Sequence, residues 1–329
     1  MGYLAQRLGF YVVTAWAAIT MNFFIPRLMP GNPVEIILSK LEVSGAIIPA
    51  SETKALEAAF GLNNHSSLLA QYFQYWAQLF HGNLGISIAE DPSTVLSVIK
   101  TGLPWTIGLI GTATIIAFIL GTVIGTMAAW RRGSWLDVAL PASAILQALP
   151  YFWVGLVAIE IFGVKLHWFP LSGGYDASLP TTLSSVFLGS VSYHAILPAL
   201  TIVLTSMSVW MVGQRNQMIT TLDQDYILVA QAKGLSQRRI MIMYAARNAI
   251  LPNFASFGVA LGLVVGGSLI VEIVFSYPGI GYWLLQAVGS EDFSLMQGIF
   301  LIITMSVLIA NFLADLCYVL LDPRARQEA

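Results

Sequence analysis

Charge is what this sequence lacks most. Only 10% of its 329 residues are Asp, Glu, Lys or Arg, whereas 57% are hydrophobic and the mean hydropathy is +0.76. Soluble domains carry about 25% charged residues, so this chain has too few polar side chains to cover a water-facing surface. The shortage excludes a large soluble α-helical protein.

Cysteine and catalytic motifs are also scarce. Cys317 is the only cysteine, which excludes a disulfide within the chain and a thiolate metal cluster. The four histidines are scattered without HxxxH or HExxH spacing, so no metal site is predicted. The chain has no GxxxxGK[ST] loop for ATP, and no GxSxG motif or carboxylate pair to indicate an intramembrane enzyme. We therefore expect a non-catalytic protein that binds no cofactor itself.

Six apolar runs are long enough to cross a bilayer, which takes about 20 residues per helix. The runs are Leu8 to Pro26, a stretch within Leu103 to Trp130, Val138 to Phe162, and about Ala195 to Gly213, Leu251 to Val271 and Leu295 to Ala314. Their continuous hydropathy differs from the alternating pattern of a membrane β-barrel, and the first is too long for a cleaved signal peptide. The sequence predicts an all-α polytopic membrane protein with six transmembrane helices, in a single domain over residues 1–329.

Positive charge indicates the orientation of these spans. If both termini are cytoplasmic, the inside holds ten Lys and Arg residues and the outside five, spread over many more residues. The inside set is Arg7, Arg131, Arg132, Arg215, Lys233, Arg238, Arg239, Arg247, Arg324 and Arg326. The positive-inside rule favours this orientation, which places segment 30–102 outside the membrane and segment 225–252 in the cytoplasm.

Within the outer segment a helix is predicted from about Ser67 to Phe80. Gly82, Gly85 and Pro92 mark the turns that follow it. Its apolar face consists of Leu69, Tyr72, Phe73, Trp76, Leu79 and Phe80, which recur at helical spacing. Packing of this face on the bilayer surface or on the ends of the spans is favoured over a direct ligand site.

Small residues and prolines interrupt the spans. Gly121 and Gly125 form a GxxxG pair, for which packing within one bundle is favoured over a homodimer seam. Pro141 and Pro150 are expected to kink the third span, because proline removes a backbone donor. Such kinks suit a bundle that opens and closes, although static bundles contain them as well.

Three acids lie near the ends of spans. Glu160 and Asp315 are candidates for a pathway lining or a gate, because charge at membrane depth usually faces a bundle interior or cavity. Snorkelling toward an interface is an equally weighted alternative for both. Glu272 lies at the outer end of the fifth span, and we expect it to be solvated there.

The most structured loop is the segment from Asp225 to Pro252, which holds four of the fifteen Lys and Arg residues. Asp225 is expected to cap a helix that begins near Tyr226, and Gly234 to stop that helix by adopting a positive φ. A basic stretch attracted to anionic lipid would explain the charges. It would not explain a small-residue helix stopped sharply by glycine, which favours docking on a partner.

A second helix is predicted to follow this stop. Ser236 can cap it, and it is expected to run to about Ala249, before the fifth span starts at Pro252.

The segment resembles the cytoplasmic loop of ABC importer permeases, known for a Glu-Ala-Ala…Gly pattern, and in particular their peptide and nickel branch. The matching residues are Tyr226, Ala230, Ala232, Lys233, Gly234 and Leu235, followed by Arg247, Asn248, Ala249, Leu251 and Pro252. Leu228 and Gln231 replace arginines of that pattern, and Tyr244 stands where histidine is common, so some basic docking charge is absent.

Other motifs carry the resemblance along nearly the whole chain. They are Pro30-Gly31-Asn32-Pro33, Phe60-Gly61-Leu62, Gln71-Tyr72, Gly82-Asn83-Leu84-Gly85-Ile86-Ser87, Pro150-Tyr151-Phe152-Trp153, Phe275-Ser276-Tyr277-Pro278-Gly279-Ile280-Gly281 and Asp322-Pro323-Arg324. The long outer segment resembles the B-type subunit of dipeptide and oligopeptide importers. Several ordered motifs together make this resemblance specific.

The resemblance implies the type I ABC importer permease fold with a cytoplasmic coupling helix over residues 226–235. It also implies a bacterial or archaeal plasma membrane, a second homologous permease subunit, an extracytoplasmic solute-binding protein, and two ATPase subunits that carry ATP and Mg²⁺. The residues implied in ATPase coupling are Tyr226, Ala230, Ala232, Lys233, Gly234, Leu235 and Arg238.

Peptides are the cargo that the resemblance favours, with oligosaccharide, nickel or glutathione as alternatives. A secondary transporter driven by an ion gradient is a further alternative. The sequence shows no clear repeat between its halves and few buried charges that could couple an ion, which makes this alternative weaker.

Overall fold

The computed structural model describes residues 2–28, 67–87, 93–131, 133–134, 136–267 and 269–321. The first part of the chain forms α1 (Gly2–Leu28), α4 (Leu68–Phe80), α5 (Val95–Thr106), the π-helix η1 (Ile107–Gly111), α6 (Thr112–Trp130), α7 (Leu136–Ala148), α8 (Tyr151–Ala158) and the π-helix η2 (Ile159–Lys165). Most of the predicted outer segment, with the motif at Pro30–Pro33, lies outside the described residues, as does the motif at Asp322–Arg324.

The second part of the described chain is helical as well. It forms α9 (Ser185–Leu222), α10 (Asp225–Ala232), α11 (Gln237–Arg239), the π-helix η3 (Ile240–Ala246), α12 (Arg247–Gly262), α13 (Val264–Gly267), α14 (Leu269–Val274), α15 (Ile280–Gly289) and α16 (Phe293–Leu321). Among the described residues the one β-bridge is an isolated contact between Ile86 and Thr94. The all-α prediction is confirmed for these residues.

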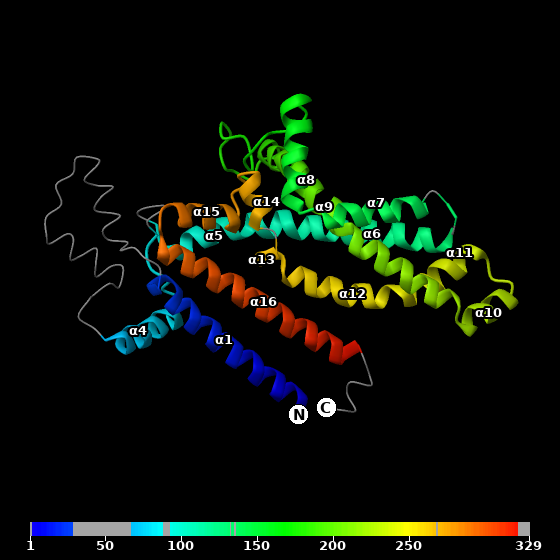
Figure 1. Cartoon of the computed structure of the whole chain (residues 1–329), viewed down its shortest axis with the longest axis horizontal. Helices are drawn as coiled ribbons and strands as arrows, with labels where there is room; N and C mark the ends of the chain where they lie inside the picture. The colour runs from blue at the N-terminus through cyan, green and yellow to red at the C-terminus, as the bar shows by residue number, and fades with distance from the viewer. Residues whose placement is uncertain are drawn as a thin grey trace.

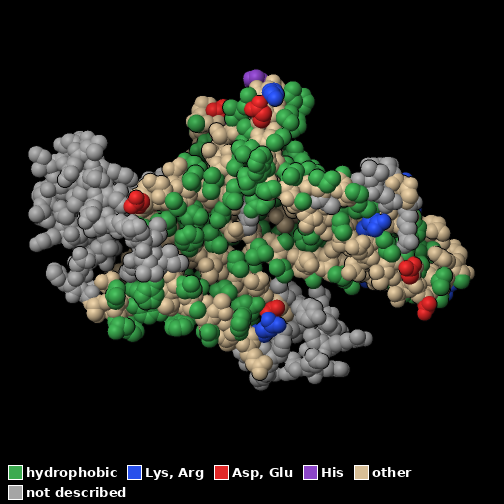
Figure 2. Space-filling model, viewed as in Figure 1, with side chains coloured by type: hydrophobic (Ala, Val, Ile, Leu, Met, Phe, Trp, Pro, Cys, Tyr) green, Lys and Arg blue, Asp and Glu red, His purple; other side chains and the backbone are tan. Residues whose placement is uncertain are grey.

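The long helices extend along the longest axis of the molecule (Figure 1). Helices α5, η1 and α6 follow one another without a gap, and α6 packs along α9. Helices α1 and α16 lie side by side along another edge. Helix α4 lies at one end of the molecule and α10 at the opposite end. On the face shown in Figure 2, hydrophobic side chains cover most of the helices and charged ones are few.

Two glycines allow α6 and α9 to approach closely. A Cβ added at Gly121 would lie 2.5 Å from the carbonyl oxygen of Met207, and one at Gly125 would lie 3.0 Å from Cβ of Gln214. Close backbone approach of this kind is what small residues provide in lipid. The GxxxG pair therefore packs inside the bundle, as favoured from the sequence, and α9 covers the face that a homodimer seam would have used.

The third apolar run consists of two helices. Helix α7 ends at Ala148, Pro150 is the N-cap of α8, and the axes of Leu140–Ala148 and Tyr151–Lys165 differ by 99°. The residue before a proline avoids the α conformation, which explains why the break falls at Leu149 and Pro150. Pro141 lies inside α7.

Three helices within the described residues are long and apolar enough to cross a membrane: Val95–Trp130, Ser185–Leu222 and Phe293–Leu313. The bent pair Leu140–Ala148 and Tyr151–Lys165 would make a fourth if it forms one span. These four match the predicted second, fourth, sixth and third runs. The helix that contains the second apolar run begins at Val95, so residues 95–102 of the predicted outer segment belong to this helix.

The two remaining predicted runs fall on α1 and on α12 to α14. The fifth run is divided by a turn at Leu263 into α12 and the short α13, and α14 follows. Gly262, at the end of α12, lies against Ala310 of α16, where an added Cβ would clash with the alanine side chain. The small residue thus lets the end of α12 contact α16 directly.

Candidate functional site: helix α10 and its surroundings

Helix α10 begins at Asp225 rather than after it. Its N-cap is Gln224, with extended backbone angles (φ −84°, ψ 145°), and no side chain makes a capping hydrogen bond. The prediction that Asp225 caps the helix is therefore wrong by one residue, because the extended conformation that a cap requires falls on Gln224. Asp225 lies in the first turn, where a negative charge interacts favourably with the helix dipole.

The predicted stop at Gly234 is confirmed. Its φ is +74°, and its N–H donates to the carbonyl of Gln231 at 2.9 Å. The N–H of Leu235 donates to the carbonyl of Ala230 at 3.3 Å, which completes a Schellman motif. A Cβ on Gly234 would meet no atom within 4 Å. Glycine is thus required for the backbone conformation, and the space around this tip is open.

One face of α10 is buried in the chain itself. Ile227 is 1% exposed and Ala230 is 2% exposed. They belong to what we call the inner cluster, which consists of Ala129, Met218, Ile227, Ala230, Ile240, Ala245 and Ala249. The amide of Asn248 also donates to the hydroxyl of Tyr226 at 3.0 Å. The inner cluster attaches α10 to α6, to α9 before it and to η3 and α12 after it.

The opposite face of α10 is open. Leu228 is 62% exposed and Val229 is 52% exposed, and Ala232 is exposed as well. The structure therefore separates two alanines that the resemblance assigned to one role, since Ala230 faces inward and Ala232 outward. Sequence analysis did not include Leu228 and Val229 in the coupling set. Helix α10 is apolar on both faces, so hydrophobic periodicity gives no signal for which side chains are exposed.

The other predicted coupling residues lie around this open face. Tyr226 is 38% exposed, while Lys233, Gly234 and Arg238 are exposed. Leu235 is partly buried and packs against the inner cluster. The predicted set thus divides into residues that support α10 from inside and residues that a partner could contact.

A continuous helical segment from Gln237 to Gly262 follows α10, through α11, η3 and α12. Ser236 is its N-cap, although the serine side chain makes no capping hydrogen bond. The predicted end at Ala249 and new start at Pro252 are wrong, because Pro252 lies inside α12. Pro252 has no N–H to donate, and the helix continues past it to Gly262.

A buried polar group, here called the polar tie, joins α6, α9 and α12. Gln214 is 0% exposed, and its Nε2 donates to Oγ1 of Thr126 at 3.2 Å. Nδ2 of Asn253 donates to the carbonyl oxygen of Trp210 at 2.9 Å and to Oε1 of Gln214 at 3.4 Å. Because a buried polar group without a partner is costly, these bonds favour one arrangement of the three helices.

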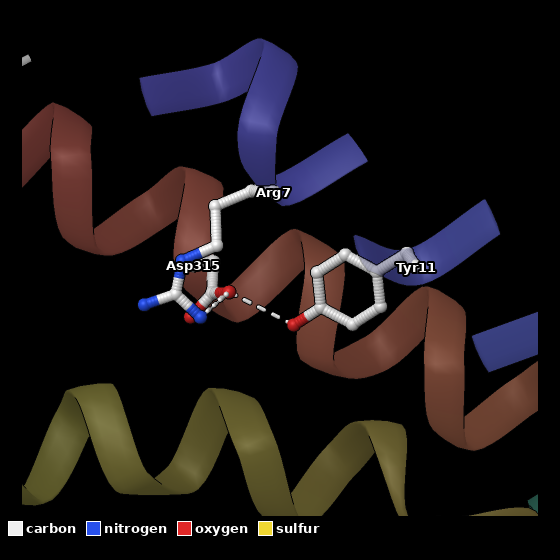
Figure 3. A network of polar contacts seen from close by, with 3 residues as sticks. All are labelled: Arg7, Tyr11 and Asp315. Carbon is white, nitrogen blue, oxygen red and sulfur yellow. Dashed lines mark hydrogen bonds and ion pairs between the residues drawn. The ribbon is translucent and has the colours of Figure 1, made fainter. Parts of the chain in front are cut away.

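Asp315 joins the helix that begins the described chain to the helix that ends it (Figure 3). Its Oδ2 lies 3.0 Å from Nη1 of Arg7 and accepts a hydrogen bond from the Tyr11 hydroxyl at 2.8 Å. Both partners come from α1, so the carboxylate connects α1 to α16. Pairing of this kind lowers the cost of an acid near membrane depth. A role of Asp315 in a gate stays a prediction.

Glu160 lies in a different environment. It belongs to η2 and pairs with Lys165 at 3.5 Å, with both side chains more than half exposed. An open ion pair of this kind contributes about 0–1 kcal/mol. Glu160 and Asp315 lie on different helices, each with its own partner, and a pathway role of Glu160 likewise stays a prediction.

Glu272 is the acid whose environment sequence analysis predicted wrongly. It is 0% exposed instead of solvated, and its Oε2 accepts the N–H of Gly281 at 2.6 Å. The neighbouring N–H of Ile280 donates to Oγ1 of Thr106 at 2.8 Å. Glu272 therefore caps α15, whose own N-cap, Gly279, has no side chain to do so. The Gly-x-Gly sequence after Glu272 is the signal that could have indicated this turn.

Comparison with known proteins identifies relatives that align with the whole chain. The sequence profile of the family described as binding-protein-dependent transport system inner membrane component matches residues 121–327. The di/tripeptide transport system permease protein DppB of Pseudomonas aeruginosa is 33% identical over 343 aligned residues, which cover 100% of this chain and 99% of that protein.

Two further relatives agree with this match. A probable D,D-dipeptide transport system permease protein, DdpB of Escherichia coli, is 31% identical over 98% of this chain and 96% of its own length. The oligopeptide transport system permease protein AppB of Bacillus subtilis is 30% identical over 92% of each chain. The chain therefore belongs to the family of inner-membrane components of binding-protein-dependent transport systems, and is a membrane permease of the ABC transporter class.

Proposed function

We propose that this chain is one of two permease subunits of an ATP-driven importer and forms, with a second similar permease, the membrane path for di- or oligopeptides. Two ATPase subunits bind at the cytoplasmic face and carry ATP and Mg²⁺. An extracytoplasmic binding protein delivers the solute. Family membership and the names of the relatives support this assignment. The open face of α10 is the structural observation that carries it.

We propose six spans, with both termini in the cytoplasm of a bacterium or archaeon. The spans are α1, α5 to α6, α7 to η2, α9, α12 to α14, and α16. We include α1 and the segment α12 to α14 as spans because α1, α12 and α13 pack along α16, which is long and apolar enough to cross a membrane by itself. The four Lys and Arg residues between Asp225 and Pro252 support this orientation.

In this arrangement α10 is the coupling helix. Its contact surface for an ATPase subunit consists of Leu228, Val229, Ala232, Lys233 and Gly234, with Arg238 beside it. Ala230 and Leu235 act from inside, by holding α10 against the inner cluster, and the hydroxyl of Tyr226 contacts Asn248. Two exposed aliphatic side chains beside an open glycine turn fit an apolar cleft on a partner, because burying them removes apolar surface from water.

Movement of α10 would reach the spans through the helices on either side of it. Helix α9 has 38 residues and packs along α6 and α12, and the segment from Gln237 continues into α12 without a break. The inner cluster and the polar tie join these helices near α10. Closure of the ATPase subunits would therefore shift α9 and α12 together, which would exchange inward-open and outward-open states.

Reconstitution in proteoliposomes tests this function. The chain would be purified with the second permease and the ATPase subunits, and uptake of radiolabelled di- and tripeptides measured with binding protein and ATP supplied on opposite sides. We expect uptake that requires both. Omission of ATP, and a binding protein without ligand-binding activity, are the controls. Uptake by this chain alone, driven by an ion gradient, would establish the secondary transporter instead.

The same preparation also tests which solute is transported. Oligosaccharide, nickel and glutathione are the alternatives to peptide, and the binding protein that purifies with the complex can be tested against each by calorimetry. Binding of di- or oligopeptides supports the proposal, whereas binding of one of the alternatives would keep the machinery and change the cargo.

A further inference from the structure

The helix at the other end of the molecule, α4, presents an apolar surface that its own chain covers only in part. None of its residues is buried, although LLAQYFQYWAQLF contains five aromatic residues and no charge. Leu69 is 70% exposed, Phe73 68% and Phe80 81%. Figure 2 shows hydrophobic side chains gathered over this helix. At about 100° per residue, the three side chains form one stripe along α4.

The other sides of the helix differ in character. Tyr72, Tyr75, Trp76 and Leu79 form a partly buried apolar side, on which the rings of Tyr72 and Tyr75 pack against Phe23 of α1. Ala70, Gln71, Gln74, Ala77 and Gln78 form the polar side. The exposed stripe lies between these two sides. A helix with an apolar side, a polar side and interfacial aromatic residues is the kind that lies in the plane of a membrane surface.

Contacts with α1 set the position of this stripe. The hydroxyls of Tyr72 and Thr20 are 2.8 Å apart, and the rings of Tyr72 and Tyr75 pack on Phe23 at 5.3 and 5.6 Å between centroids. Thr20 and Phe23 lie five to eight residues before the end of α1 at Leu28. At about 1.5 Å per residue this is about 8–12 Å along the helix from that end, so α4 packs close to the end of the apolar run Leu8 to Pro26.

The neighbouring part of α1 also exposes apolar side chains. Trp16 is 55% exposed, Met21 64% and Phe24 43%, and these residues precede or flank the positions that α4 contacts. Helix α4 lies across this end of α1 instead of extending it (Figure 1). An uncharged helix with aromatic side chains, packed on a span that itself exposes apolar side chains, fits lipid.

We infer that α4 is an interfacial helix whose stripe of Leu69, Phe73 and Phe80 inserts between the headgroups of the outer leaflet and anchors the outer end of α1. The inference rests on the proposed membrane arrangement, in which α1 is a span. An isolated helix of 13 residues is marginal in water, so contact with α1 on one side and lipid on the other explains why this segment is helical.

Neighbouring residues on α4 supply a matched test. Cys317 is the only cysteine, so Cys317→Ser gives a background for single cysteines that carry a nitroxide spin label. Phe73→Cys reports on the stripe, and Gln74→Cys, one residue further, reports on the polar side. Leu69→Cys and Gln78→Cys repeat the comparison elsewhere on α4. Each complex is reconstituted in proteoliposomes, and collision of the label with oxygen and with a water-soluble nickel chelate is measured.

We expect the ratio of oxygen to nickel collisions to be severalfold higher at 73 and 69 than at 74 and 78. Equal access of nickel to both members of each pair would place the stripe in water, and exclusion of both reagents from the stripe would place it against another protein. Either result overturns the inference. The readout needs neither ATP nor solute, so a failure of peptide uptake would be distinguished from a failure of this proposal.

Discussion

Helices α4 and α10 are short, lie at opposite ends of the molecule, and are attached to it in different ways (Figure 1). Helix α10 buries Ile227 and Ala230 in the inner cluster and ends in a Schellman motif, although it has only eight residues. Helix α4 has 13 residues and buries none of them. Length therefore does not decide how firmly either helix is held.

The difference corresponds to what each helix is proposed to contact. A coupling helix must transmit force, so it needs a fixed attachment on one side and an open surface on the other. An interfacial helix follows the bilayer surface, where lipid supplies part of the apolar environment and a few contacts with α1 suffice. The two helices thus divide their apolar residues differently between the chain and its surroundings.

The largest effect is expected from Gly234→Asp. An L residue in the left-handed region costs about 1–2 kcal/mol, and each 1.4 kcal/mol is a factor of about ten in an equilibrium constant. With the added charge at the tip, ATP-driven uptake in vesicles should fall at least tenfold while membrane insertion is retained. Gly133→Asp is the control, because Gly133 also has a positive φ (+79°), no atom within 4 Å of an added Cβ, and a place in a different turn. Full uptake by the Gly234 variant would contradict the proposed role.

The next prediction compares two alanines on α10. Ala230→Leu should overpack the inner cluster and destabilise the chain by about 1–3 kcal/mol, visible as a lower unfolding temperature in detergent. Ala232→Leu should leave that temperature unchanged and reduce co-purification of the ATPase subunits instead. The opposite pattern would show that α10 faces its partner with the Ala230 side.

Removal of the polar tie is expected to have an intermediate effect. Gln214→Leu removes the hydrogen-bond partner of Thr126 and one of the two acceptors of the Asn253 amide, which costs about 1–3 kcal/mol. We expect a lower unfolding temperature. We also expect more ATP to be hydrolysed per solute imported, because α9 and α12 would no longer shift together. Gln217→Leu, on the exposed side of α9, is the control, and equal behaviour of the two variants would remove the polar tie from the proposal.

The smallest effects are expected from two tyrosine hydroxyls, one in each region. Tyr72→Phe removes the contact with Thr20, and Tyr226→Phe removes the contact with Asn248. Each substitution should lower the free energy of unfolding by at most about 1.5 kcal/mol, measured by thermal unfolding. Uptake should decrease slightly for Tyr226→Phe and stay unchanged for Tyr72→Phe. A larger loss of uptake for Tyr72→Phe would mean that α4 takes part in the transport cycle.

Local sequence signals predicted several elements correctly. The helix expected from Ser67 to Phe80 is α4, with Ser67 as its N-cap. The stop at Gly234, the break at Pro150 and the packing of Gly121 and Gly125 inside the bundle are likewise confirmed. Each of these features depends on the conformation of one or two residues or on a short periodic pattern, so the sequence carries the signal locally.

Features that depend on contacts between distant segments were predicted less well. Glu272 was expected in solvent because it follows an apolar run, and only the turn that returns through Gly279 and Gly281 encloses its carboxylate. Pro252 was expected to start a helix, and it lies inside α12, which follows η3 without a break. Neither outcome has a signal at the residue itself.

By itself, the sequence determined a helical membrane chain and a glycine-stopped helix between the fourth and fifth apolar runs. Composition and short motifs are sufficient for these, because they follow from the cost of polar groups in lipid and from backbone sterics. Only the tertiary structure decided that Ala230 faces inward and Leu228 outward, that Gln214 joins three helices, and that α4 leaves a stripe uncovered. Whether a side chain is buried or exposed depends on contacts between segments that are distant in the sequence, and these contacts form only in the folded chain.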